Sequence, residues 1–363
     1  MQGNNRDEKI MSGCAISGIL NKKGKRVSGQ EIIKSIALMH ERSNGLGGGF
    51  AAYGVYPDHK DEYAFHLFFD NNRAQDSVED FINRHFRISF MEEVPTREHG
   101  ILSQVPIIWR YFTQPEPKKL DSSDLSEEEY VTRCVMNING NYKGAYVVSS
   151  GKNMGVFKGV GYPEDIAEFY KLDEYQAYLW TAHGRFPTNT PGWWGGAHPF
   201  TLLDWSIVHN GEISSYGANK RYVNMFGYKC TMMTDTEVIT YLFDLLIRKH
   251  ELPLEVVVKI LAAPLWSEIA HMGDKERKLA KTIRTVYGSA LLNGPFSIIL
   301  GHRNGFIALN DRIKLRPLVV AEAGDRMYVA SEESAIREIC EDPETVRSPR
   351  GGEPVIGSLE GVS

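Results

Sequence analysis

The sequence predicts an α+β fold in which two packed sheets are covered by helices. Strand-like segments lie near both ends of the chain, and the clearest helical pattern lies between them. This order differs from the regular alternation of strand and helix that builds a parallel sheet. The chain has 363 residues, of which 42% are apolar and 11% are aromatic. Such a chain can bury a large core within one domain that carries insertions.

The first predicted strand begins at a cysteine. Cys14 opens an apolar run punctuated by glycine, and a polar turn separates it from a segment, 29–41, with the apolar spacing of a helix. Four glycines follow within 44–49, without the Gly-Lys-Ser/Thr sequence of a phosphate loop. We interpret this segment as a flexible turn or a close approach of the backbone beside a site. Further strands are predicted at 50–56 and 63–69.

Residues 71–143 have weaker patterns and are predicted to contain an insertion. Within them, 114–129 is rich in proline, serine and acidic residues, which favours an exposed loop. A helix is expected at 78–86, and a strand broken by Pro106 within 101–111. Strands return at 145–149 and 177–183.

The second half of the chain contains the clearest helix, at 234–249. Thr234 and Glu237 have the spacing of a capping box, and apolar residues recur on one face. Before it, 184–200 holds too much proline, glycine and tryptophan for regular structure. The polar tail at 343–363 is predicted to be flexible. The other predicted elements are strands at 206–209, 296–300, 306–309, 317–321 and 327–330, and helices at 254–262, 276–292 and 331–340.

Charge and hydropathy exclude several classes of function. The net charge of −5 gives no indication of binding to nucleic acid or to an anionic membrane surface. No apolar run approaches the roughly 18–20 residues of a membrane span. The polar leader at 1–13 lacks the apolar stretch of a secretory signal, so we expect a cytoplasmic protein.

The four cysteines are far apart in the sequence and predict no metal site. Cys134, Cys230 and Cys340 are interpreted as small buried apolar residues. Cys14 differs because of its position near the start of the chain. An N-terminal cysteine can act as a nucleophile with its own α-amino group as the general base. That amine has a pKa of about 8 in model peptides, which suits neutral pH.

A cysteine that attacks an amide also needs oxyanion donors and groups that hold the substrate. The side-chain N–H of Asn210 and the backbone N–H of Gly211 can converge on one oxygen, although an Asn-Gly pair alone most often forms a type I′ hairpin turn. Arg185 can bind a carboxylate, or it can be a surface cation. Asp235 can bind an ammonium group, or it can simply favour the start of a helix.

In order and spacing these fragments resemble the class II glutamine amidotransferases, and most closely the glutaminase domain of glutamate synthase. The matching segments extend from Cys14 to about Ile339. The motifs that carry the resemblance are Gly13-Cys14, Arg185-Phe186-Pro187-Thr188-Asn189-Thr190, Ala197-His198-Pro199, His209-Asn210-Gly211-Glu212-Ile213, Thr234-Asp235-Thr236-Glu237, Gly294-Pro295-Phe296-Ser297, Asp311-Arg312-Ile313-Lys314-Leu315-Arg316-Pro317-Leu318 and Ala330-Ser331-Glu332.

The resemblance implies an Ntn-hydrolase fold, a four-layer αββα sandwich, over residues 14–342. It implies that Cys14 forms a thioester with glutamine, that Asn210 and Gly211 hold the oxyanion, and that Arg185 and Asp235 bind the α-carboxylate and α-ammonium groups. Phe186, Thr188, Asn189 and His209 are the further substrate-binding residues that it implies. Three departures from the family pattern, at Ala15, Pro187 and Ile313-Lys314, remove none of these chemical groups.

The resemblance also implies processing and a partner. Residues 1–13 would be a propeptide, because the amine of Cys14 is free only after cleavage of its bond to Gly13. The flavin (FMN) barrel and iron–sulfur cluster of glutamate synthase have no counterpart in this sequence, so both cofactors are expected on a separate synthase subunit that receives the ammonia. Two alternatives stay open: an amidotransferase for another acceptor, such as an N-methylglutamate synthase, and an unprocessed, inactive regulatory subunit.

Overall fold

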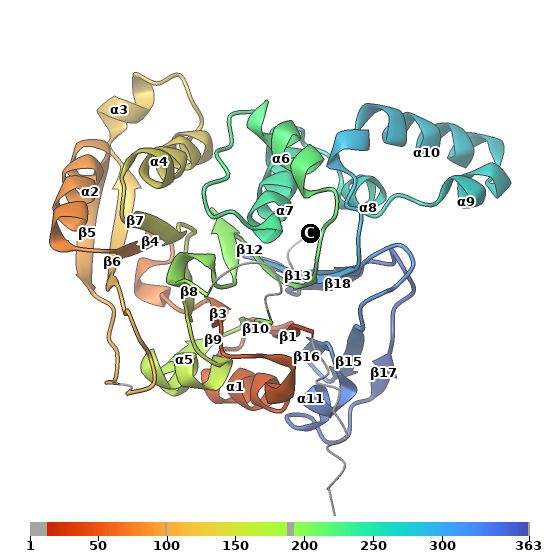
Figure 1. Cartoon of the computed structure of the whole chain (residues 1–363), viewed down its shortest axis with the longest axis horizontal. Helices are drawn as coiled ribbons and strands as arrows, with labels where there is room; N and C mark the ends of the chain where they lie inside the picture. The colour runs from red at the N-terminus through yellow and green to blue at the C-terminus, as the bar shows by residue number, and fades with distance from the viewer. Residues whose placement is uncertain (1–12, 99, 187–191, 362–363) are drawn as a thin grey trace, which may run out of the picture.

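Two antiparallel sheets face each other at the centre of the molecule (Figure 1). The structure is a computed structural model that describes residues 13–98, 100–186 and 192–361. In the described chain, the first sheet has the strand order β17-β15-β16-β1-β10-β3-β8 and the second has the order β11-β12-β13-β14-β18. The first sheet consists of β1 (Ala15–Asn21), β3 (Gly48–Tyr53), β8 (Met154–Gly159), β10 (Leu179–Gly184), β15 (Val319–Ala323), β16 (Arg326–Ala330) and β17 (Thr345–Arg347). The second consists of β11 (Phe200–Leu202), β12 (Trp205–Gly211), β13 (Phe296–His302), β14 (Gly305–Asn310) and β18 (Val355–Ser358).

The two sheets approach each other closely at β1 and β13. A Cβ added to Gly18 would lie 3.3 Å from the Cδ1 atom of Ile299, so this face of β1 has no room for a larger residue. Since side chains alternate between the faces of a strand, Cys14 and Ile16 share the inward face with Gly18. The core between the sheets includes Val208 and Ile299, both fully buried.

Helices cover both outer faces, which confirms the predicted α+β fold with two packed sheets between helical layers. Figure 1 shows α1 (Gly29–Ala37), α5 (Pro163–Phe169) and α11 (Glu333–Arg337) beneath the first sheet. Over the second sheet lie α6 (Tyr216–Asn224) and α7 (Asp235–Asp244), and α7 continues as a π-helical turn at Leu245–Lys249. The chain continues through α8 (Leu254–Leu261), α9 (Trp266–His271) and α10 (Asp274–Val286). No helix of the described ranges is both long and apolar enough to cross a bilayer.

The segment predicted as an insertion supplies β5 and β6, two of the four strands of a third sheet at one side of the molecule (Figure 1). Its strand order is β5-β6-β4-β7, and α2 and α4 pack beside it. The predicted exposed loop at 114–129 holds the end of β6, a short helix and the start of α4, so that expectation was wrong in part. The elements are β4 (Tyr63–Phe69), α2 (Asn72–His85), β5 (Phe86–Glu93), β6 (Ile107–Pro115), α3 (Pro117–Asp121), α4 (Glu127–Asn141) and β7 (Ala145–Ser149). A two-stranded ladder joins β2 (Val27–Ser28) to β9 (Gln176–Ala177), and 3-10 turns occupy His40–Arg42, Pro57–His59, Leu172–Glu174, Trp194–Gly196 and Gly288–Ala290.

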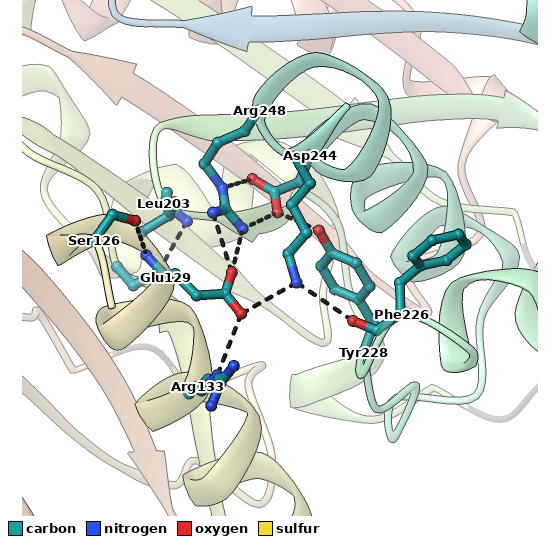
Figure 2. Close-up of polar contacts among 10 residues, drawn as sticks. Ser126, Glu129, Arg133, Leu203, Phe226, Tyr228, Asp244 and Arg248 are labelled. Carbon is teal, nitrogen blue, oxygen red and sulfur yellow. Dashed lines mark hydrogen bonds and ion pairs between the residues drawn. The ribbon is translucent and has the colours of Figure 1, made fainter. Parts of the chain in front are cut away.

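An ion-pair network, the Glu129 junction, fixes the third sheet to α7. Figure 2 shows Glu129 of α4 pointing toward Arg248, which lies 3.2 Å away and also bonds the fully buried carboxylate of Asp244. Burial acts to raise the pKa of Glu129, but Lys249 and Arg248 outweigh it and lower the pKa. The hydroxyl of Tyr228 donates to Asp244 at 2.5 Å. The end of α7 is therefore held by groups from two other parts of the chain.

Two predictions about local structure were wrong. The tail at 343–363 is not a loose segment over its described length, because β17 pairs with β15 and β18 pairs with β14. Val355 of β18 is buried in the core at 1% exposure. The sequence did not predict β17 and β18, because strands of three and four residues are too short to show an alternating pattern. Thr234 does cap α7, by accepting a bond from the N–H of Thr236, but Glu237 turns away from the cap and accepts the N–H groups of Thr231 and Met232 at 2.9 Å.

Candidate active site

Cys14 lies just before β1 on the face that meets the second sheet. Its sulfur accepts a hydrogen bond from the backbone N–H of Phe186 at 3.3 Å. Its carbonyl oxygen accepts one from Nε of Arg42 at 3.2 Å. Burial raises the pKa of the Cys14 thiol, and the Phe186 N–H, Arg185 and Arg316 oppose this shift. The thiol thus has a fixed backbone donor and two neighbouring guanidinium groups that favour its thiolate.

Arg185 follows β10, the strand paired with β1. Ala15 and Gly184 are cross-strand partners, so the residues beside them, Cys14 and Arg185, lie at the same end of the sheet. Arg185 is only 6% exposed, and its backbone N–H donates to the carbonyl oxygen of Gly47 at 2.8 Å. A Cβ at Gly47 would lie 3.1 Å from the Cδ atom of Arg185. This contact confirms the interpretation of 44–49 as a close backbone approach beside a site, and it is not consistent with Arg185 being a surface cation.

Asn210 and Gly211 end β12 directly opposite the first sheet. Both are paired with β13, with Ser297 and Phe296 as partners, so they do not form a hairpin turn. Asn210 is fully buried, and its Nδ2 lies 3.5 Å from the Oγ atom of Ser331. Gly211 has φ 147°, and a Cβ there would lie 2.0 Å from the carbonyl oxygen of Pro295. Only glycine fits this position, which sets the direction of its backbone beside the Asn210 amide.

Asp235 is the first residue of α7, where the helix dipole favours a negative charge. Its Oδ2 atom accepts the N–H of Ile213 at 2.9 Å, and its Oδ1 atom lies 3.7 Å from Nδ1 of His209. Burial acts to raise the pKa of Asp235, but His209 and the backbone N–H groups of Ile213 and Thr236 lower it to about 2. The site therefore holds a fixed carboxylate at neutral pH, and its charge is felt at both Cys14 and Arg185.

His209 supports Asp235 from behind rather than facing Cys14. It precedes Asn210 on β12, so its side chain lies on the opposite face of the strand, toward α7. Its Nδ1 lies 3.1 Å from Oγ1 of Thr236, which also bonds Nε2 of His198 at 2.7 Å. The ring of His198 stacks on His183 at 4.1 Å. Direct substrate contact by the His209 side chain, as the sequence resemblance implied, does not fit this orientation.

Two of the buried imidazoles, those of His183 and His198, carry no charge at neutral pH. Burial lowers the pKa of His183 to about 3, and that of His198 falls well below its ordinary value for the same reason, so both rings are neutral. Within the residues that the structure describes, no group of three or more histidine, cysteine or acidic side chains can hold a metal ion. The rings of His183 and His198 stack on each other and form hydrogen bonds beneath the site, to the carbonyl oxygen of His209 and to the hydroxyl of Thr236.

The structure brings together Cys14, Phe186, Arg185, Asn210, Gly211 and Asp235. The elements that position them are β1, β10, β12 and α7, which are labelled in Figure 1. Thr188 and Asn189 lie outside the described residues. Arg42, Arg316, Thr236 and Ser331 belong to the same neighbourhood, and sequence reasoning gave them no role. For Thr236, Arg316 and Ser331 the only sequence signal was their place inside motifs that had been identified for other residues.

The sequence is similar to that of known glutamine amidotransferases. A family model described as "Glutamine amidotransferases class-II" matches residues 59–234. An uncharacterized protein of Archaeoglobus fulgidus is 51% identical over 97% of this chain and 94% of its own length. A putative glutamine amidotransferase of Methanothermobacter thermautotrophicus is 25% identical over 91% of this chain and 95% of its own.

Larger proteins match in part. The glutamate synthase [NADPH] large chain of Bacillus subtilis is 24% identical over 64% of this chain but only 16% of its own length. Among solved structures, the glutamine phosphoribosylpyrophosphate amidotransferase of Bacillus subtilis matches 96% of this chain at 15% identity and a TM-score of 0.48. The chain spans about half the length of that amidotransferase, at 48%.

Proposed function

We propose that this chain, which belongs to the class II glutamine amidotransferases, hydrolyses glutamine to glutamate and ammonia through a thioester at Cys14. One observation carries the proposal. A thiol, a buried guanidinium, an ionised carboxylate and an amide–glycine pair converge from four separate elements of the fold. Together they meet three requirements of amide hydrolysis: the thiol attacks, the guanidinium and the carboxylate bind the substrate, and the amide–glycine pair stabilises the oxyanion.

Charge complementarity supports glutamine as the substrate. The α-carboxylate of glutamine would bind Arg185, whose planar guanidinium can form two parallel hydrogen bonds to it. The α-ammonium group would bind Asp235, whose low pKa keeps the carboxylate charged. These two groups would fix the amino-acid end of the substrate and present its side-chain amide to Cys14. Phe186, Thr188 and Asn189 remain proposed as further contacts.

The proposed chemistry is acyl transfer to sulfur. The Cys14 sulfur attacks the carboxamide carbon, and the oxyanion that forms accepts hydrogen bonds from Nδ2 of Asn210 and the backbone N–H of Gly211. The C–N bond then breaks as the thiol proton, carried by a general base, reaches the leaving nitrogen and releases ammonia. Water attacks the thioester in the second half-reaction, which releases glutamate and regenerates the thiol.

The general base proposed is the α-amino group of Cys14. In the described chain this nitrogen belongs to the peptide bond with Gly13, so the mechanism requires that bond to be cut. We propose that residues 1–13 are a propeptide and that the thiol itself attacks the carbonyl carbon of Gly13, with water completing the hydrolysis. The new amine would have a pKa near 8, so about one-tenth of it would be deprotonated at pH 7 and about half at pH 8.

We further propose that the ammonia passes to a separate synthase subunit of the glutamate synthase type. The match to a glutamate synthase large chain supports this choice of acceptor. The flavin and the iron–sulfur cluster would reside on that subunit. Pull-down from a native lysate should recover a flavoprotein, and recovery of none would contradict this part of the proposal.

The test of the reaction combines two measurements on the purified protein. Intact mass should show a chain that begins at Cys14, and the processed protein should release ammonia and glutamate from glutamine. The Cys14→Ala variant should release neither. A full-length, stable chain with no glutamine turnover would overturn the proposal and favour a regulatory subunit.

A further inference from the structure

The hydroxyl of Ser331 touches both halves of the candidate site. Ser331 follows β16, which pairs with β1, and it is 1% exposed. Its Oγ atom accepts the backbone N–H of Ile16 at 3.1 Å and lies 3.5 Å from Nδ2 of Asn210. Its own backbone N–H donates to the carbonyl oxygen of Ile16 at 2.9 Å. One side chain therefore joins β1, the strand that follows Cys14, to the Asn210 amide on the opposite sheet.

The next residue reaches Cys14 by another route. The carboxylate of Glu332 accepts a hydrogen bond from Arg42 at 2.9 Å. Nε of Arg42 donates to the carbonyl oxygen of Cys14 at 3.2 Å. Ser331 thus contacts the Asn210 amide, and Glu332 is connected to Cys14 through Arg42. Both residues lie more than 300 positions after Cys14 in the sequence.

We propose that Ser331 is a positioning residue that sets the distance between the Cys14 sulfur and the Nδ2 group of Asn210. This inference rests on the proposed function of Cys14 and Asn210. The nucleophile Cys14 and the oxyanion donor Asn210 lie on different sheets, so neither sheet alone determines the distance between them. A residue that bonds to both sheets can fix this distance. Ser331 does so with a single oxygen that accepts from both sheets. The second N–H of the Asn210 amide is then left to face the substrate oxygen.

The neighbouring polar residues show that burial of a hydroxyl at this face is not enough. Ser297 is the cross-strand partner of Asn210, and Asn310 is the partner of Ser297. Both are fully buried on the same face of the second sheet, yet neither side chain finds a hydrogen-bond partner among the described residues. Ser297 is therefore a matched control: a buried serine one strand away that bonds to nothing on the first sheet.

The experiment compares Ser331→Ala with Ser297→Ala under conditions where urea unfolding shows both to be folded. Ser331→Ala should lower kcat for glutamine about tenfold to a hundredfold, because a misplacement of about 1 Å is enough for such a loss. The KM should change little, since Arg185 and Asp235 still bind the substrate. Ser297→Ala should keep the wild-type kcat. Ser331→Cys, which keeps the shape and weakens both bonds, should be intermediate and serves if the alanine variant does not fold.

A double-mutant cycle with Asn210→Ala separates positioning from a general structural role. If Ser331 acts through Asn210, Ser331→Ala should cost much less in the Asn210→Ala background than in the wild type. Equal fold losses in both backgrounds, or an unchanged kcat in Ser331→Ala, would overturn the inference. If one of these two results were found while the wild-type protein is active, only the role of Ser331 would be refuted and the proposed function would remain. If the processed wild-type protein does not turn over glutamine, the proposed function itself is refuted.

Discussion

Replacement of Asp235 by asparagine tests the substrate-binding half of the site most directly. Asparagine keeps the shape of the side chain, and its amide oxygen can still accept the Ile213 N–H that now lies 2.9 Å from the carboxylate. The negative charge is lost. At an effective dielectric constant near 20, a carboxylate and an ammonium group 3 Å apart attract by roughly 5 kcal/mol. The Asp235 side chain is 21% exposed, so solvent reduces the net loss to about 2–3 kcal/mol.

This energy corresponds to a fall of about 30- to 150-fold in kcat/KM for glutamine. The assay should compare glutamine with glutaramic acid, which is glutamine without its α-amino group. Wild-type protein should prefer glutamine, and the Asp235→Asn variant should lose most of that preference while it turns over glutaramic acid as the wild type does. Urea unfolding provides the folding control. An equal loss for both substrates would refute the assignment of Asp235 to the ammonium group and indicate a structural role instead.

Three further predictions concern stability and support of the site. Burial lowers the pKa of His66 to about 3, so below pH 6.5 the unfolded chain binds a proton that the folded chain does not. The free energy of unfolding should fall by about 2 kcal/mol between pH 7.5 and pH 5 from this residue alone, and urea midpoints of His66→Gln should depend less on pH; an unaltered slope would contradict this. Glu129→Gln should lower the free energy of unfolding by about 1–3 kcal/mol because Arg248 loses a partner, whereas Arg133→Ala, whose side chain is 65% exposed, should cost under about 0.5 kcal/mol; similar values for the two would argue against the Glu129 junction. Thr236→Val should raise the KM for glutamine by about tenfold, because the imidazoles behind Asp235 lose their shared hydroxyl; steady-state kinetics with an unchanged KM would show that Asp235 needs no such support.

The layered arrangement of sheets and helices and the main site residues could be predicted from the sequence. Apolar runs with a period of two or 3.6 report burial directly, and α7 and the central strands are long enough to show it. Arg185 and Asp235 were assigned to the site through the motifs that resemble class II amidotransferases, because each residue taken alone also fits a structural role. The close contact at Gly47 could also be predicted, since a cluster of glycines indicates contact with backbone or with a neighbouring side chain.

Other features depend on contacts between distant segments and leave little local trace. Ser331 meets Ile16 across 315 residues and Asn210 across 121, so no short motif could indicate its partners. The orientation of His209 relative to Asn210 follows from β12, which continues through Asn210 and Gly211, whereas the strand predicted from the sequence ended at 209. The short strand β18 is recognisable only once its neighbour β14 is known.

That strand has a practical consequence for anyone who shortens the protein. The last residues look dispensable in the sequence, yet β18 covers the open hydrogen-bonding edge of β14 from Gly305 to Ala308. Truncation before Val355 would uncover this edge in the same sheet that carries Asn210 and Gly211. Exposed edges recruit strands from other molecules, so a trimmed chain would self-associate during purification long before its chemistry could be measured. Affinity tags at the C-terminus are safer when they extend the chain than when they replace its final strand.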